Sequence, residues 1–596
     1  MRVSSLKIEN FRGIRDGFVR FNKHAVLIGD NNAGKTTLIE ALALLLGRDR
    51  LIRELTEHDF YGSCPQPADR IKLVATITGF VADDPEQNSD WFRDGRAVVK
   101  WLDEATGTVH SLRNDARWRL CCQIAAQAYF DQDSLTVEVV RYFHDHDNPI
   151  DPFAEDSPVG VPGKLVQQLG FYLVRASRTW DKVFSWGSEL FKRTVHAAAA
   201  QPSRAVLAER DRLRAPVQPI EADPQMEPLI QRVNAEIARC FPNAPAIQLR
   251  LTGTDSRSVM DAVSAHFAAP GGPSIPAARQ GSGLLSMQGL LLLLELGRAR
   301  DVAGDGFLMA LEEPELHLPP SAQQRLVQRV QALSTQTFVT THSPLVASMA
   351  DPTSVMVLRQ HGGVLKAEPF LASPLLPDTP NWKRKFFQHS RVDVLSALMQ
   401  PSMLIPEGKA DFHLLRSILR PLMVTEGWLA SMTIAFGIEV GVVPTEDAKV
   451  IETYQEMARL HERVCCLVDG DGDGLQYAAR LLASPAPPFA VIRWHDDAMI
   501  EDAIGWILQA EEATVVAALA EMTQPAPTSV AAVVSYLKSH KMDIVAYEQV
   551  ADVIANCPPC RTRAADLLGG LASVCAGSPA TLRFALGANG VWIFQQ

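Results

Sequence analysis

Three aspartates stand at every second position in the segment CCLVDGDGDG, residues 465–474. They are Asp469, Asp471 and Asp473. Carboxylates at this spacing hold divalent cations, either in a calcium-binding loop or in a catalytic centre. A calcium loop of the EF-hand type also needs a Glu at its twelfth position and a helix in front, whereas this chain has Arg480 there and a segment typical of a buried strand, residues 464–468, in front. The choice between the two sites therefore depends on which other acids reach the same place.

Further acids follow apolar segments of the same half of the chain. Residues 402–406 predict a strand that ends at Glu407, and the helix after it carries Asp411 one turn further on. Strands are also predicted for residues 432–436, 464–468 and 488–494. Glu501 follows the last of these strands. The carboxyl ends of parallel strands meet at one edge of a sheet, and four or more acids there need cations to neutralise them, so the sequence predicts a site for divalent metals.

A different chemistry is predicted near the amino terminus. Residues 25–28 predict a strand, and the Gly-rich loop and helix after it match the pattern G-x-x-x-x-G-K-[ST]. The matching residues are Gly29, Gly34, Lys35 and Thr36. In this motif backbone N–H groups wrap the phosphates, Lys35 reaches the β- and γ-phosphates and the Thr36 hydroxyl ligates Mg2+. The sequence therefore predicts binding of ATP with Mg2+.

The middle of the chain offers the residues that ATP hydrolysis would also need. Residues 307–311 predict a strand that ends in two carboxylates, Glu312 and Glu313. Glu312 can hold the magnesium and Glu313 can polarise the attacking water. Residues 337–341 predict another strand, which ends at His342, where an imidazole can touch the γ-phosphate. We therefore expect Glu313 and His342 to act in hydrolysis.

Together with the opening segment LKIENFRGI, which contains Arg12, these motifs resemble those of the ABC-type ATPases of the SMC and RecF group. In that group a signature segment of one subunit closes over the ATP of the other. The segment RQGSGLLSMQGLLLLLELG is similar to it, which implies that Ser282 contacts the γ-phosphate within a homodimer. The cofactor-binding residues so implied are Arg12, Gly29, Asn32, Gly34, Lys35, Thr36, Thr37, Ser282 and Glu312. The chain departs from the group at Glu312, where Asp is usual, and at His58 and Asp59, where a glutamine is expected.

The acids of the second half resemble another family pattern. Glu407-Gly408, Asp411 and Asp469-x-Asp471 are similar to the motifs of the Toprim domain of topoisomerases, primases and certain nucleases. An ABC ATPase ahead of a Toprim domain resembles the OLD (overcoming lysogenization defect) family of ATP-linked nucleases. The resemblance implies a metal-dependent DNA endonuclease with a two-metal mechanism, using Mg2+ with Mn2+ or Ca2+ as alternatives, in phage defence or DNA processing. The implied metal ligands are Thr36, Glu312, Glu407, Asp411, Asp469, Asp471 and Glu501.

The resemblance also implies a catalytic lysine, for which Lys541 is favoured over Lys538. It assigns no role to Asp473 and leaves a helicase partner open. The alternative function is an SMC/RecF-like, ATP-switched DNA-binding clamp whose Toprim half is inactive. A topoisomerase would need a tyrosine nucleophile in a separate DNA-gate domain, and a primase would need template and zinc modules; neither is recognisable in the sequence.

The expected strands and helices that carry these residues alternate along the chain, which predicts an α/β protein with several domains. We expect an ABC/SMC-like P-loop ATPase with a helical insertion, followed by a Toprim domain with a parallel, Rossmann-like sheet and a helical tail. The expected boundaries are 1–160 and 251–375 for the ATPase, 161–250 for a helical insertion used in dimerisation, 376–392 for a basic linker, 393–510 for the Toprim domain and 511–596 for a mainly helical carboxyl-terminal region.

Composition limits the partners and the compartment. A net charge of −11 means that contact with DNA must be local. The longest aliphatic run, Leu290–Leu294, is too short to span a bilayer, and the amino terminus lacks the apolar stretch of a signal peptide, so we expect a cytoplasmic protein without membrane contact. The odd number of cysteines, nine, argues against a disulfide framework.

The expected linker interleaves basic and aromatic residues. They are Trp382, Lys383, Arg384, Lys385, Phe386, Phe387 and Arg391. Such a segment either contacts DNA phosphates or packs its aromatic rings on a neighbouring domain. The sequence leaves both interpretations open.

Overall fold

The computed structural model describes residues 1–47, 54–154, 160–176, 188–197, 203–241, 243, 245–268, 270–316, 318–423, 436–522, 526–578 and 583–596. The chain forms two compact units. The smaller unit contains residues 1–2 and 163–337, and the larger unit contains residues 3–162 and 338–596. Strand β13 (Gln336–Thr340) begins in the smaller unit and ends in the larger one.

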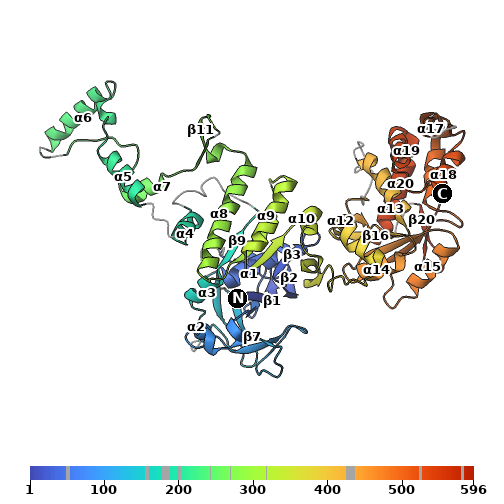
Figure 1. Ribbon diagram of the computed structural model, residues 1–596, viewed down its shortest axis with the longest axis horizontal. Helices are drawn as coiled ribbons and strands as arrows, with labels where there is room; N and C mark the ends of the chain where they lie inside the picture. Colours follow the sequence, from blue (N-terminus) through green and yellow to red (C-terminus); the bar gives the residue numbers. More distant parts are fainter. Residues whose placement is uncertain are drawn as a thin grey trace. The chain divides into compact units, whose positions relative to one another are not determined.

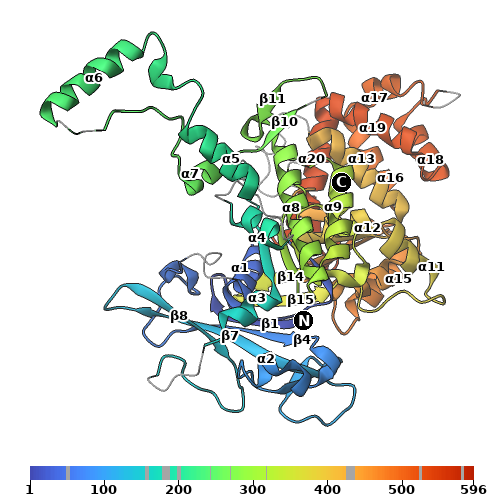
Figure 2. The same ribbon diagram turned by 60° about the vertical axis from the view of Figure 1, so that its left-hand side comes forward.

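The larger unit contains a mixed sheet built from the first part of the chain and from the segment after β13 (Figure 1). Its strands are β1 (Arg2–Phe11), β2 (Ile14–Arg20), β3 (His24–Ile28), β4 (Ile71–Thr78), β5 (Lys100–Asp103), β6 (Thr108–His110), β7 (Arg119–Asp131), β8 (Thr136–Phe143), β14 (Val355–His361) and β15 (Val364–Pro369). Their order is β6-β5-β7-β4-β1-β2-β15-β14-β3, and β8 pairs with β7 in the long hairpin seen in Figure 2. Strands β3 and β14 are parallel, and helix α1 (Lys35–Leu46) follows β3.

The smaller unit is mainly helical. Its helices are α3 (Gly163–Leu169), α4 (Glu189–Ala197), α5 (Ser203–Arg214), α6 (Glu227–Cys240), α7 (Ser256–Asp261), α8 (Ser282–Val302) and α9 (Pro320–Leu333). Its strands are β9 (Phe171–Val174), β10 (His266–Ala268), β11 (Ser274–Pro276) and β12 (Leu308–Glu312). The long helix α8 packs against α4 and α9.

Residues 161–250, which we expected to be a helical insertion, also contain a strand, β9. Strand β9 pairs in parallel with β12, with Phe171 opposite Leu308, so the sheet extends into the segment predicted as helical. A buried strand of four residues shows neither the alternation of a half-exposed strand nor the length of a helix, and periodicity does not identify it. The rest of the segment does contain helices, of which α6 is the longest within residues 161–250.

The last part of the larger unit contains a second sheet, of order β17-β16-β18-β19-β21-β20. The strands are β16 (Ser402–Pro406), β17 (Val440–Val442), β18 (Val464–Val468), β19 (Ala490–Arg493), β20 (Phe584–Leu586) and β21 (Trp592–Phe594). Only β20 is antiparallel to its neighbour. The strands predicted at 402–406, 464–468 and 488–494 are therefore confirmed, while residues 432–435 of the fourth lie outside the described part of the chain.

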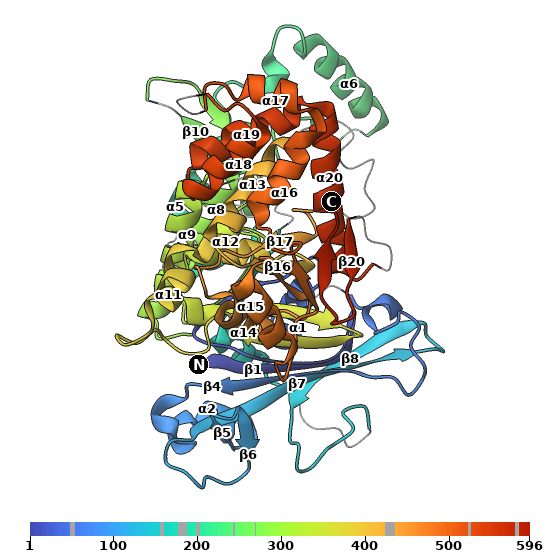
Figure 3. The ribbon, with the colours of Figure 1, turned by 90° about the vertical axis from the view of Figure 1, so that its right-hand side faces the viewer.

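Helices cover both faces of this second sheet (Figure 3). On one face lie α13 (Lys409–Met423), α16 (Ile500–Leu508), α18 (Val530–Ser539), α19 (Ile544–Asn556) and α20 (Pro558–Ala576), with α13 and α20 against β16. On the other face α14 (Val450–Ala458) and α15 (Gly472–Leu482) contact β18. The carboxyl-terminal region is not a helical tail alone, because its two last strands complete the sheet. These strands have three residues each, too few for a pattern to reveal them.

The expected basic linker is folded onto its neighbours. Lys383 pairs with Glu456, and Lys385 Nζ lies 3.6 Å from Glu446 Oε2. Arg391 Nη1 donates to the carbonyl oxygens of Ser348 and Ala350 at 2.8 and 3.0 Å. Phe386 and Phe387 are buried. This packing favours the structural interpretation of the segment over DNA contact.

Candidate functional site

The Gly-rich loop has the backbone that its motif requires. Gly29 has φ +151° and Gly34 has φ +91°, a region that residues with a side chain rarely adopt. A Cβ on Gly29 would lie 2.3 Å from the carbonyl oxygen of Leu358 in the neighbouring strand. Lys35 is buried, and its ammonium donates to the carbonyl oxygens of Gly29 and Asp30 at 2.9 and 2.7 Å. The loop therefore holds a cation at the amino terminus of α1, where phosphate groups bind.

The other predicted nucleotide contacts on this unit lie around the same helix start and the β1–β2 turn. Asn32 has φ +71°, Thr36 is exposed in the first turn of α1, and Thr37 is half-buried. Arg12 Nε donates to Asp59 Oδ1 at 2.8 Å. The segment that contains His58 and Asp59, where a glutamine was expected, therefore orients the arginine. Arg12 also lines a cavity of about 620 Å3 together with His58, Tyr61 and three small residues.

Strand β12 delivers the predicted carboxylates. Glu312 is buried, and its Oε2 accepts a hydrogen bond from the Ala176 N–H at 3.3 Å. Glu313 has φ +46°, a strained value for a residue with a side chain; such strain costs about 1–3 kcal/mol and is concentrated at functional sites. Strain at this residue is consistent with the catalytic role predicted for it.

Two further predicted site residues, His342 and Ser282, lie close to the end of β13 and at the start of α8. His342 follows β13, and the preceding residue, Thr341, donates its N–H to the Leu27 carbonyl of β3, the strand that leads into the Gly-rich loop. Ser282 is the first residue of the 21-residue helix α8 and is exposed. A long helix that starts at an exposed serine offers N–H groups and a hydroxyl to an anion.

The acidic edge of the second sheet begins with two neighbouring parallel strands. Glu407 directly follows β16, and Asp469 directly follows β18. The Asp469 N–H donates to Glu407 Oε2 at 2.8 Å. The strand ends therefore bring together two acids that lie 62 positions apart in the chain.

Two further buried acids join this edge from helices. Asp411 lies in the first turn of α13 and Glu501 is the second residue of α16; their exposed fractions are 6% and 1%. Burial, followed by the charges of Glu501 and Glu407, raises the pKa of Asp411 to about 7. Burial, followed by the charges of Asp411 and Glu407, raises the pKa of Asp469 to about 9. Four acids are thus close enough to repel one another as carboxylates.

Two carboxylate oxygens of this edge are buried without a hydrogen-bond partner among the described residues. They are Oδ1 of Asp469 and Oε1 of Glu501. A buried charged oxygen is costly unless a hydrogen bond or a cation satisfies it. Oxygen-only donors with a high negative charge fit hard cations such as Mg2+, Mn2+ or Ca2+. The chemistry of these donors therefore fits the predicted metals.

The aspartate-rich segment itself is a strand-to-helix turn. Asp471 caps α15, since its Oδ1 accepts from the Gly474 N–H at 2.8 Å, and Asp473 lies exposed in the first turn of that helix. An EF-hand loop continues as a loop for twelve residues, whereas here a helix begins at Gly472. The calcium-loop interpretation is therefore excluded.

The structure separates the two candidate lysines. Lys538 Nζ pairs with Asp502 at 2.7 Å. Lys541 is exposed in the loop between α18 and α19, and its positive charge partly opposes the burial that raises the pKa of Glu407 and of Asp411. Lys541 is therefore the lysine whose charge acts on the acids of this edge. Sequence reasoning missed Asp447, whose Oδ1 accepts from the Lys409 N–H at 3.2 Å at the start of α13.

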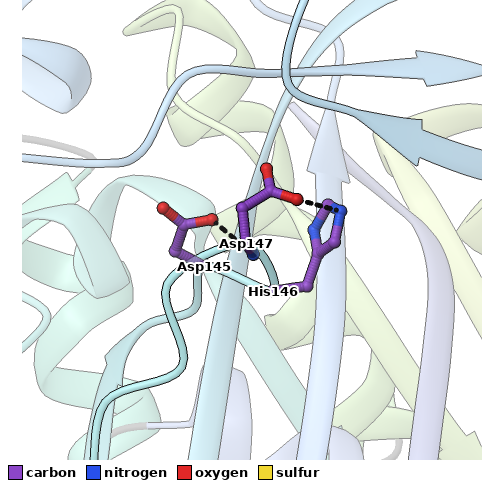
Figure 4. A group of neighbouring side chains, drawn as sticks. All are labelled: Asp145, His146 and Asp147. Carbon is purple, nitrogen blue, oxygen red and sulfur yellow. Dashed lines mark hydrogen bonds and ion pairs between the residues drawn. The ribbon is translucent and has the colours of Figure 1, made fainter.

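A separate group of metal-binding side chain types lies after β8 (Figure 4). Within the described ranges, Asp145, His146 and Asp147 are the residues whose ligand atoms all lie within 4.8 Å of one another. The buried ammonium of Lys100 lies 2.6 Å from Asp145 Oδ1 and 2.6 Å from Asp147 Oδ2. Because this cation already pairs with both carboxylates, we interpret the group as a structural ion-pair cluster.

Two segments in the first part of the chain match known protein families. Residues 1–123 match the family described as "AAA ATPase domain", and residues 190–348 match "AAA domain, putative AbiEii toxin, Type IV TA system". No curated protein matches the chain. Both family descriptions are of AAA domains, and the matched segments contain the Gly-rich loop and the Glu312 strand. The chain therefore contains a P-loop ATPase, as the sequence predicted.

Solved structures of SMC head domains align with 61–62% of the chain. The SMC head bound to the C-terminal winged-helix domain of ScpA is 12% identical over 62% of this chain and 98% of its own, with a TM-score of 0.34. The SMC head from Thermotoga maritima is 13% identical over 62% and 99%, with a TM-score of 0.27. The Pyrococcus furiosus head with an extended coiled coil, bound to the C-terminal domain of ScpA, is 10% identical over 61% and 95%, with a TM-score of 0.33. Scores this low carry no conclusion about function.

None of the helices in the described ranges is both long enough and apolar enough to cross a bilayer.

Proposed function

We propose that this protein is an ATP-binding and ATP-hydrolysing, divalent-metal-dependent DNA endonuclease. The observation that supports the proposal best is the acidic edge of the second sheet, where Glu407, Asp411, Asp469 and Glu501 converge and two buried carboxylate oxygens have no partner in the described part of the chain. Acids placed at the ends of parallel strands match the motif pattern of Toprim nucleases. The proposal therefore assigns a Toprim-type domain to the second sheet.

The acidic edge would hold two divalent cations through Glu407, Asp411, Asp469, Asp471 and Glu501. When bound, such cations supply the positive charge that activates water and stabilises the leaving oxygen of a phosphodiester. The chain's own part is to fix the ligands: the Asp469 N–H orients Glu407, and the cap on α15 orients Asp471. Lys541, exposed beside this edge, would stabilise the negative charge that develops on the phosphoryl oxygens.

The ATPase half would bind ATP with Mg2+ through Lys35, Thr36 and Glu312, while Glu313 and His342 assist hydrolysis. Ser282 would contact the γ-phosphate of a second copy of the chain, so the active particle would be a homodimer. Phage defence is the biological role that the family resemblance suggests.

Cleavage of a supercoiled plasmid tests the proposal. The protein is incubated with plasmid and Mg2+, Mn2+, Ca2+ or EDTA, each with and without ATP, and the nicked and linear products are separated on a gel. We expect nicked or linear DNA with Mg2+ or Mn2+ and none with EDTA. DNA that is bound but uncut with every metal, with and without ATP, would instead support an ATP-switched clamp.

A further inference from the structure

The loop that carries Lys541 is attached at both ends to helices that carry acids of the candidate site. On one side α18 packs on α16, which contains Glu501, and Lys538 Nζ pairs with Asp502 of α16 at 2.7 Å. On the other side α19 packs on α13, which contains Asp411. The loop between α18 and α19 therefore has its ends fixed relative to both acids.

Hydrogen bonds also fix the loop internally. The Tyr536 hydroxyl donates to Asp543 Oδ2 at 3.0 Å, and Asp543 Oδ1 accepts from the Ala546 N–H at 3.1 Å to cap α19. The His540 ring stacks on the Tyr536 ring, with centroids 4.2 Å apart and an angle of 15° between the planes. The residues on both sides of Lys541 are thus held in one conformation.

The residue after Lys541 has a strained backbone that a buried tyrosine stabilises. Met542 has φ +71°, a left-handed value that costs a residue with a side chain about 1–3 kcal/mol. Its N–H donates to the hydroxyl oxygen of Tyr547 at 2.9 Å. Tyr547 has an exposed fraction of 0% and belongs to the core of the second sheet domain. Its hydroxyl is therefore a rigid acceptor that holds the strained turn in place.

We propose that Tyr547 is a positioning residue for Lys541. Through its hydrogen bond to Met542, it keeps the lysine beside the acidic edge, where the phosphoryl group of DNA would lie. This inference rests on the proposed nuclease function. It extends that function by assigning a role to Tyr547, which lies on α19. In this role Tyr547 would contact neither DNA nor metal itself.

The electrostatics of the region are consistent with this role. Burial raises the pKa of Tyr547, and the charges of Glu501 and Asp411 raise it further, so the phenol lies within the field of the acids and stays protonated. The Lys541 charge acts in the opposite direction on Glu407 and Asp411. Asp411 thus interacts electrostatically with both the buried Tyr547 and the exposed Lys541.

A double-mutant cycle tests the proposal. Tyr547→Phe keeps the buried ring and removes only the acceptor, and Lys541→Met removes the charge. Single-turnover plasmid cleavage is measured for the wild type, both single variants and the double variant. Tyr454→Phe is the matched control, because Tyr454 is also buried in this domain and its hydroxyl donates to the Ala486 carbonyl at 2.6 Å, on the opposite face of the sheet.

We expect Tyr547→Phe to lower the cleavage rate about tenfold, because a small displacement of a catalytic group is costly, with less than a twofold change in the KM for DNA. In the Lys541→Met background the same substitution should change the rate less than twofold. Hydrogen–deuterium exchange should show faster exchange at Met542 in Tyr547→Phe, and Tyr454→Phe should cleave like the wild type.

Equal losses in the two backgrounds, or an unchanged rate in an active Tyr547→Phe variant, would overturn the positioning role alone. If Tyr547→Phe does not fold, Met542→Gly is measured in the same cycle, because glycine adopts a positive φ without strain and loosens the turn, and it must give the same pattern. A wild type that cleaves no DNA with any metal would overturn the nuclease function and this inference with it.

Discussion

The backbone N–H of Asp469 donates a 2.8 Å hydrogen bond to Oε2 of Glu407. This bond joins the ends of two adjacent parallel strands and holds the Glu407 side chain against the end of β18. It leaves Oδ1 of Asp469 buried and, among the described residues, without a hydrogen-bond partner. Glu407 is therefore held in place by a hydrogen bond, while Asp469 keeps a carboxylate oxygen without a partner among the described residues. Both features are expected of residues that bind a cation.

The first prediction concerns metal binding. Wild-type protein without nucleotide should bind two Mn2+ ions per chain at the acidic edge, measured by isothermal titration calorimetry, and Asp469→Asn should weaken this binding at least about tenfold because a charged ligand is lost. Glu548→Gln, an exposed acid on α19, is the control and should bind like the wild type. Equal binding by Asp469→Asn would contradict the assignment.

The second prediction concerns pH and stability. Asp411 and Asp469, with pKa values raised to about 7 and about 9, keep protons in the folded chain that the unfolded chain has already lost near pH 4. The folded state thus binds more protons, and the free energy of unfolding of the metal-free protein should fall as pH rises from about 5 to 9.

Thermal denaturation in EDTA at several pH values measures this dependence. Asp469→Asn, which cannot ionise, should have a shallower fall in Tm over this range than the wild type. Added Mn2+ should raise the wild-type Tm more at pH 8.5 than at pH 5.5, because protons compete with the metal for the carboxylates. A larger metal effect at the lower pH would be incompatible with these ligands.

The third prediction concerns the Gly-rich loop. Lys35→Ala should weaken ATP binding at least about tenfold, because hydrogen bonds to charged groups contribute about 1.5–3 kcal/mol. Binding of Mn2+ at the acidic edge should persist. The control is Lys23→Ala, at an exposed lysine just before β3, the strand that precedes the Gly-rich loop. Normal ATP affinity in Lys35→Ala would rule out the P-loop role.

The fourth prediction concerns the basic segment at residues 382–391. Because Lys383 and Lys385 already pair with Glu456 and Glu446, replacing Lys383, Arg384 and Lys385 by Gln should leave the salt dependence of DNA binding unchanged. Loss of even one phosphate contact would flatten the slope of log K against log salt by about 0.9. Fluorescence anisotropy with a labelled duplex measures the slope, and a change of that size would restore DNA contact as the explanation.

The fifth prediction concerns shared ATP sites. Lys35→Ala and Ser282→Arg subunits, each without ATPase activity alone, should recover part of the activity when coexpressed as heterodimers. One composite site then carries both substitutions and the other carries neither. Verified heterodimers without recovery, or a monomeric particle with full ATPase activity, would exclude sites made from two subunits.

The sequence predicted the parts of the site that depend on local spacing. The Gly29–Thr36 loop is recognisable because its glycines, lysine and threonine are contiguous, and the acidic edge is predictable because Glu407 and Asp469 each end an apolar run. Contacts between distant residues were not predictable. The partners of Lys383 and Lys385 lie more than 60 residues further along, so local composition could not distinguish a linker from a DNA-binding segment. Strand β9 was missed because four apolar residues carry no period.

The most direct test of the nuclease function is plasmid cleavage by a matched pair of variants, Asp469→Ala at the acidic edge and Asp552→Ala at an exposed position on α19 of the same domain. Both are assayed with the wild type in Mg2+ and in Mn2+, after ATP binding has been confirmed for each. We expect the wild type and Asp552→Ala to convert supercoiled plasmid to nicked and linear forms, while Asp469→Ala leaves it supercoiled. Cleavage by Asp469→Ala at the wild-type rate would contradict a nuclease site at the acidic edge.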